Sequence, residues 1–186
     1  MSRTPFVPRD VVRVWAAFAG LGAGLVHAAT VGPRLTESVV AGVILVVLMA
    51  AQLGWALLVL SRGAVPLPRL SVAVSLGLVV LWAGTRATGL APVGLADVVA
   101  AGLHLSVAWL VMADLRATAD DARAGAGADA VPDGRSAGAG AGRRFALLFA
   151  GALLASAVTT PALAASEAGQ HAVPHGEHLT GLTGHH

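Results

Sequence analysis

Residues 38–60 read SVVAGVILVVLMAAQLGWALLVL and contain no charged side chain. A helix that crosses a bilayer needs about 20 consecutive, mostly apolar residues, and this stretch supplies them without interruption. Its one strongly polar side chain within the apolar run is the amide of Gln52. The stretch therefore predicts a transmembrane helix.

Four further stretches have the same character, at roughly 11–31, 70–90, 96–116 and 145–165. Only 12% of the 186 residues are charged and 56% are hydrophobic, whereas a soluble domain carries about 25% charged residues. Five buried helices in a soluble chain of this length would lack a polar shell to cover them. The sequence predicts an all-α integral membrane protein with about five transmembrane helices.

The apolar stretches divide the chain into four parts. Residues 1–116 form a predicted four-helix transmembrane unit, whose short loops favour antiparallel neighbours. Residues 117–144 are dominated by Ala, Gly and Asp, a composition that buries too little apolar surface to offset the entropy of ordering, so we expect a disordered cytoplasmic linker. Residues 145–165 form the fifth transmembrane helix, and residues 166–186 form a histidine-rich extracytoplasmic tail.

The orientation is predicted from arginine, since the chain has no lysine. Cytoplasmic flanks of transmembrane helices are enriched in basic residues. With a cytoplasmic N-terminus, only Arg34 and Arg86 of the 12 basic residues fall toward the outside. We therefore expect a multi-pass protein of the plasma membrane with its C-terminus outside. The partner is the lipid bilayer and not nucleic acid, because the net formal charge is only +2 and no basic stripe alternates with aromatic residues.

The tail is the first candidate site. Of seven histidines in the chain, five lie in the last sixteen residues: His171, His175, His178, His185 and His186. Imidazole ligands without any cysteine favour Cu(II), Zn(II) or Ni(II), and we expect Cu(II) or Zn(II) with the first three as principal ligands. A solvated tail that is merely rich in histidine is the alternative. The small residues around Ala162–Ala164 also fit a signal-peptidase site, and cleavage there would release the tail.

The second candidate site is an intramembrane polar cluster of His27, Arg86, Asp97 and His104. Polar groups inside membrane helices are costly and usually face the bundle interior, and these four are expected in the outer half. Arg86 either reaches the headgroups or pairs with Asp97. The two histidines either form hydrogen bonds within the packing or ligate a b-type haem, although their expected depths differ by roughly 5 Å from the rise per residue.

Several stretches resemble a family of small polytopic membrane proteins from high-GC Gram-positive bacteria. They are LWAGTRATGLAPVGLADVVAAGLH, which holds Arg86, Asp97 and His104, together with the stretch from His27 to Leu60 and the tail TTPALAASEAGQHAVPHGEH. The resemblance implies a membrane protein with a histidine-rich C-terminal tail, and it implies no specific activity. Relatives often carry glutamate where His104 stands and a longer segment after Gly89-Leu90, so this chain departs from the pattern there.

Two function classes follow. The first is a transition-metal-binding or transport-accessory protein that uses its outer histidines. The second is a structural or assembly subunit that packs against another membrane protein, or a second copy, through small residues such as the GxxxG of Gly20 and Gly24. We expect no enzyme, because the sequence has no HExxH, no serine elbow and no paired carboxylates at one helix level.

Overall fold

A computed structural model describes residues 8–89, 94–125 and 137–165, which form five α-helices and no strand. They are α1 (Arg9–Glu37), α2 (Val39–Arg62), α3 (Pro68–Ala87), α4 (Leu95–Gly125) and α5 (Ala137–Ala164). Each is long and apolar enough to cross a membrane. The predicted fold class, an all-α membrane protein with five spanning helices, is confirmed.

The helix boundaries follow local backbone chemistry. Ser38 alone separates α1 from α2: its extended backbone ends α1, and its hydroxyl accepts a hydrogen bond from the Ala41 amide at 3.4 Å. Serine is a favoured helix N-cap for this reason. Gly63 ends α2 with a left-handed backbone, φ 62°, which glycine adopts without steric penalty, and Pro68 then begins α3 at the position where its missing N–H costs nothing.

The expected linker, residues 117–144, is too long and needs correction. Residues 117–125 continue α4 and residues 137–144 begin α5, so what separates the two helices is 126–136, which lies outside the described residues. Alanine is the best helix former, and Ala117, Ala119 and Ala122 extend α4 beyond its apolar part. This composition is poor in core residues, but it does not prevent helix formation next to an existing helix end.

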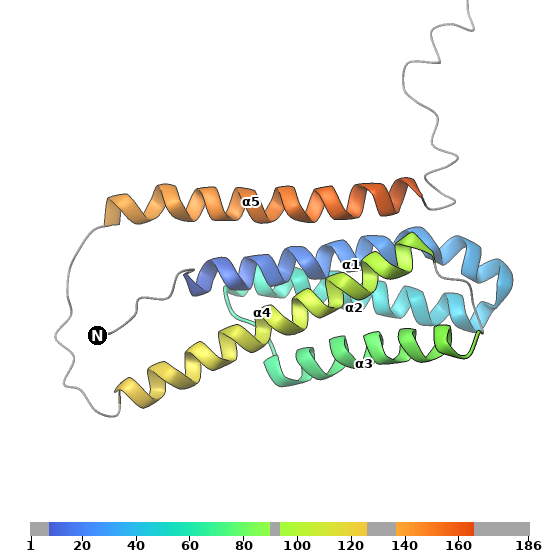
Figure 1. The fold of residues 1–186 in the computed structure, drawn as a ribbon, viewed down its shortest axis with the longest axis horizontal. Coiled ribbons are helices and arrows are strands. Elements are labelled where there is room, and N and C mark those ends of the chain that lie inside the picture. The colour runs from blue at the N-terminus through green and yellow to red at the C-terminus, as the bar shows by residue number, and fades with distance from the viewer. Residues whose placement is uncertain (1–7, 90–93, 126–136, 166–186) are drawn as a thin grey trace, which may run out of the picture.

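Helix α1 is the centre of the bundle, in contact with α2, α4 and α5. Figure 1 shows α5 running alongside α1 while α4 crosses the bundle obliquely toward α3. The core lies between α1 and α4, where Ala16, Ala23 and Val26 pack with Val107 and Val111. In contrast, α2 and α3 are adjacent in the chain, but their backbones stay apart and Trp55 of α2 reaches Ser71 of α3 through its side chain. The expected packing of neighbouring helices is therefore loosest for α2 and α3.

Glycines of α1 set the close approach of its neighbours. A Cβ at Gly20 would lie 3.0 Å from the Trp55 ring, and one at Gly24 would lie 2.8 Å from Leu53, both on α2. A Cβ at Gly22 would lie 2.7 Å from Thr159 of α5 and 3.2 Å from Leu103 of α4. The GxxxG of Gly20 and Gly24 thus packs against α2 within the chain. On the other side of α1, Gly22 allows α4 and α5 to approach closely.

The outer surface is apolar, as lipid contact requires. Large side chains that are at least half exposed occur along α2, α3 and α5, including Val40, Val47, Val80, Phe145 and Leu154. The apolar window of α2 is only 11% buried, against 44% for α1. Helices α1 and α4 therefore form the interior, and α2, α3 and α5 present most of their surface to lipid.

Gly22→Ala should destabilise the protein by about 1–3 kcal/mol, the usual cost of overpacking, because the added methyl group meets Thr159 at 2.7 Å. Gly77→Ala is the matched control, since a Cβ there meets nothing within 4 Å. Thermal or denaturant unfolding in detergent micelles measures both. Equal stabilities of the two variants would contradict the proposed close packing of α1.

Candidate functional site

Polar side chains occupy three levels of the bundle. The first level is the arginine-rich end of the bundle, which holds Arg9 and Arg13 at the start of α1. The second is the opposite end, which holds Arg86 near the end of α3 and Asp97 near the start of α4. The third level lies between them and contains the two intramembrane histidines. The middle level and the arginine-rich end join α1 to α4, whereas the opposite end joins the consecutive helices α3 and α4.

At the opposite end, Arg86 and Asp97 form an ion pair. The guanidinium Nη2 of Arg86 lies 2.7 Å from the Asp97 Oδ2, with the two side chains 10% and 27% exposed. The same carboxylate oxygen accepts a hydrogen bond from the Gly94 amide at 3.1 Å, near the N-terminus of α4, where negative charge is favourable. The expected pairing of Arg86 with Asp97 is present, and both side chains have partners here.

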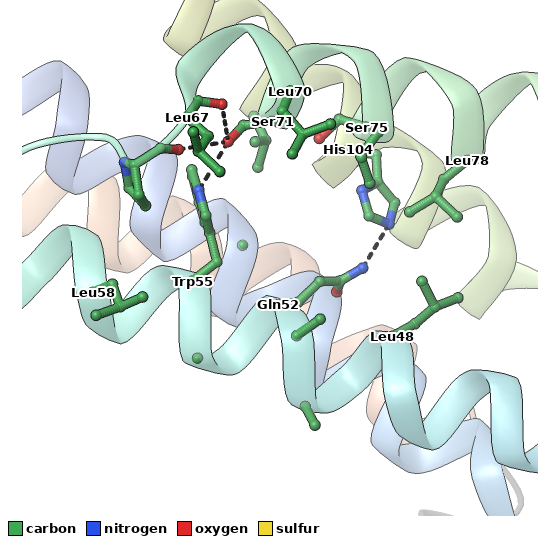
Figure 2. Close-up of a pocket in the computed structure, with 17 residues that line it drawn as sticks. Leu48, Gln52, Trp55, Leu58, Leu67, Leu70, Ser71, Ser75, Leu78 and His104 are labelled. Atoms are coloured by element: carbon green, nitrogen blue, oxygen red, sulfur yellow. Dashed lines mark hydrogen bonds between the residues drawn. The ribbon is translucent and has the colours of Figure 1, made fainter.

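In the middle level, His27 of α1, Gln52 of α2 and His104 of α4 meet. His104 Nε2 lies 3.1 Å from Gln52 Nε2 and 3.4 Å from His27 Nε2. The imidazole of His104 is buried, and Figure 2 shows it facing Gln52 across the interior of the bundle. The sequence placed both histidines in the same half of the membrane but did not associate Gln52 with them.

His27 and Gln52 both lie within hydrogen-bonding distance of the same nitrogen, Nε2 of His104. His104 Nε2 is either an N–H donor or a lone-pair acceptor, so it cannot donate to one neighbour and accept from the other. The assignment of nitrogen and oxygen in the Gln52 amide depends on the hydrogen-bond network, and either orientation suits one tautomer of His104. The arrangement therefore places the imidazole nitrogen of His27 and the amide of Gln52 next to Nε2 of His104.

A b-type haem does not fit between His27 and His104. The two rings lie close together, with centroids 5.7 Å apart. Axial ligands bind iron from opposite faces of the macrocycle, which must then pass between the rings. The two nitrogens are already 3.4 Å apart, with Gln52 at 3.1 Å, which leaves no room for the macrocycle.

The arginine-rich end contains an ion pair that sequence reasoning missed. Arg13 Nε lies 3.0 and 3.1 Å from the two carboxylate oxygens of Asp114, and its Nη1 donates to the Gly63 carbonyl at 3.0 Å. Asp114 is buried, with 7% exposure. The polar cluster predicted from the sequence was placed in the other half of the bundle and does not include this pair. The available signal was that both Arg13 and Asp114 fall inside the apolar stretches and not in their flanks.

A cavity of about 520 Å3 lies between α2 and α3 and reaches α1 and α4 at Gly20, His104 and Val107. Trp55 crosses the space between the two helices and donates a hydrogen bond to the Ser71 hydroxyl at 3.0 Å. Figure 2 shows Gln52, Trp55 and His104 facing this cavity among leucines of α2 and α3. Sequence reasoning did not predict it, since a gap between two helices has no periodic signature.

The tail histidines, His171, His175, His178, His185 and His186, lie outside the described residues. Within residues 8–89, 94–125 and 137–165, no group of three or more His, Asp or Glu side chains could hold a metal ion. The pair of His27 and His104 supplies two imidazoles. The predicted metal site of the tail stays a prediction.

Asp114→Ala should destabilise the protein by roughly 3 kcal/mol, because it leaves the Arg13 guanidinium without its carboxylate in a poorly solvated position. Glu37→Ala, which removes the exposed partner of Arg34, is the matched control and should cost less than about 1 kcal/mol. Unfolding in detergent measures both. Similar small losses in the two variants would mean that Arg13 and Asp114 are both effectively hydrated.

Comparison of the chain with protein-family models finds no match, and comparisons with curated proteins and with solved structures find none either. Functional inference therefore depends on the residues of the chain itself.

Proposed function

We propose that the protein binds a transition-metal ion in the membrane and acts as a metal-binding or transport-accessory protein. The observation that carries the proposal is the 3.4 Å separation of His27 Nε2 and His104 Nε2. A tetrahedral ion that holds imidazole nitrogens at about 2.0–2.1 Å keeps two of them about 3.3–3.4 Å apart. The pair is thus spaced as two ligands of one ion.

Gln52 supports this site as a third donor. With its amide rotated, the Gln52 oxygen takes the position 3.1 Å from His104 Nε2. Imidazoles suit Zn and Cu, and the chain has no cysteine to favour a softer ion. These ligands are neutral, so they add no charge of their own to the bilayer interior.

The histidine-rich tail is the proposed capture site of the same function. It follows α5, which ends at Ala164, and so begins at the end of the bundle that carries Arg86 and Asp97. The histidine pair lies in the half nearest that end: His104 is seven residues, or about 10 Å, along α4 from Asp97. In the proposed orientation this end faces outward, and tail and pair lie on one side of the plasma membrane.

One argument for the alternative function, an assembly subunit that docks through small residues, no longer holds. Gly20 and Gly24 already contact α2, and Gly22 contacts α4 and α5. The GxxxG of α1 is therefore not available to a membrane-protein partner or a second copy. The apolar faces of α2, α3 and α5 remain, and lipid suffices to cover them.

The proposed orientation has a direct test. A reporter that is active only outside the cytoplasm should be active when fused after His186 and inactive when fused before Met1. The reason is the excess of arginine at the N-terminal end of α1 and its partners. Activity with the opposite pattern would reverse the orientation and would place the tail in the cytoplasm.

Calorimetry with Zn(II) and Cu(II) on the full chain at pH 7.5 tests the two sites separately. Substitution of His171, His175 and His178 by Ala should remove the tail site, and His27→Ala with His104→Ala should remove the intramembrane site. We expect each loss to weaken its site by more than about tenfold, since even outer-shell substitutions at metal sites cost that much. Binding at the tail should weaken at pH 5.5, because protonated imidazole is no ligand.

The control keeps the tail but alters its other pair, His185→Ala with His186→Ala, and should have the smaller effect. Heats in both main variants equal to those of the unmodified protein would refute metal binding at either site.

A further inference from the structure

We propose that the peptide bond between Ala164 and Ala165 is a cleavage site for a membrane-bound signal peptidase, and that the packing of α5 on α1 protects it. A folded copy then keeps its histidine-rich tail, and a copy whose α5 has left the bundle loses it. The proposal rests on the outward orientation of the C-terminus proposed above, because signal peptidases cut secretory signals at the outer face of the membrane. It does not depend on metal binding.

The sequence of α5 has the three parts of a secretory cleavage signal. Such a signal has a positively charged start, an apolar centre and small residues in an A-x-A pattern before the bond that is cut. Arg143 and Arg144 provide the charge, and the apolar centre runs over residues 145–158. Ala162 and Ala164 are the small residues, so the cut falls after Ala164.

In the folded bundle this site is closed. Helix α5 continues to Ala164, and the Ala165 amide donates to the Pro161 carbonyl at 2.9 Å. Ala162 is 1% exposed and belongs to the same core cluster as Ala23 of α1. Proteolysis occurs where the backbone is neither buried nor hydrogen-bonded. The bond is therefore cut only in a state in which this turn of α5 has opened.

Two contacts with α1 hold α5 in place. Near the tail, Thr159 is 7% exposed and packs at Gly22, where a Cβ would lie 2.7 Å from the methyl carbon of Thr159. Nearer the start of α5, Trp15 donates a hydrogen bond to the Leu147 carbonyl at 2.8 Å, and its ring occupies the space at Gly151 that a Cβ would need. Both contacts join α5 to the central helix, so together they keep its last turn against the core.

The last turn of α5 depends on this packing because it is a poor helix by itself. Pro161 lies inside the helix, where proline has no N–H to donate and its ring crowds the preceding turn. Only 17% of the apolar window of α5 is buried, against 44% for α1, and α5 contacts α1 more than it contacts α4. The contacts with α1 are therefore the main barrier to opening of the Ala164–Ala165 bond.

Cleavage at this bond would separate the two proposed metal sites. Water adds across the amide: the Ala164 carbonyl becomes a terminal carboxylate, and the Ala165 nitrogen becomes the terminal ammonium of a released peptide. That peptide, residues 165–186, carries all five tail histidines, whereas His27 and His104 stay in the membrane. Protection by packing thus restricts the tail to copies in which α5 is assembled with the bundle.

Expression of the full-length protein in a bacterium, with the reporter fused after His186, tests the proposal. Thr159→Leu overpacks the contact with Gly22, whereas Thr160→Leu makes the same change at an exposed neighbour. Immunoblots measure the released reporter fragment, and mass spectrometry of its N-terminus locates the cut. We expect little fragment from the unmodified protein and from Thr160→Leu. Thr159→Leu should give roughly tenfold more, because overpacking disfavours the docked state and cleavage follows the population of the open state.

Two further variants separate undocking from local chemistry. Trp15→Ala removes the other contact with α5, far along the chain from the bond, and should also raise the amount of fragment. Addition of Ala164→Phe to Thr159→Leu should abolish the fragment, because a large side chain then replaces the small residue before the cut.

Equal amounts of fragment from Thr159→Leu and Thr160→Leu, or from Thr159→Leu and the unmodified protein, would show that packing does not protect the bond. A Thr159→Leu protein that stays uncut while its reporter is active would show that the bond is no substrate. An inactive reporter would reverse the orientation and overturn the proposal with it. Metal binding is measured separately by calorimetry, so none of these outcomes decides it.

Discussion

The close packing of α1 against its neighbours is the constraint on which the rest of the structure depends. Apolar side chains gain little by leaving lipid for a helix interface, so membrane helices associate through close contact of small residues. Gly20 and Gly24 give α2 that contact, and Gly22 gives it to α4 and α5. One helix turn of small residues thereby makes α1 the common partner of three helices, and it brings His27 within reach of Gln52 and His104.

The same constraint explains why the bundle is incomplete between α2 and α3. The backbone of α3 lies close to α4 and not to α2, and a Cβ at Gly77 or Gly84 would meet nothing within 4 Å, so neither glycine of α3 is used for close contact. Trp55 spans part of the gap by its hydrogen bond to Ser71. What remains is the cavity, with Gln52 on its wall. The packing that assembles the histidine pair therefore also leaves the space beside it.

The two least exposed ion pairs in the described part of this bundle each join two different helices. Arg13 with Asp114 joins α1 to α4, and Arg86 with Asp97 joins α3 to α4. Removal of one member of a buried pair strands the other in a poor solvent, so these pairs fix which helices are neighbours and at what depth. The pair of His27 and His104 lies between these two charged levels. At this level the polar groups of the interior are two imidazoles and the amide of Gln52.

The sequence by itself determined the number of helices, their apolar character and the identity of most polar residues inside them, because length and hydropathy are local properties that a bilayer imposes on each segment separately. It also made the pairing of Arg86 and Asp97 predictable, since a short loop joins their helices. Only the tertiary structure decided that Gln52 meets His104, that Arg13 meets Asp114, and that α2 and α3 leave a cavity. These depend on the angle and depth at which helices cross, which packing sets and no single segment encodes.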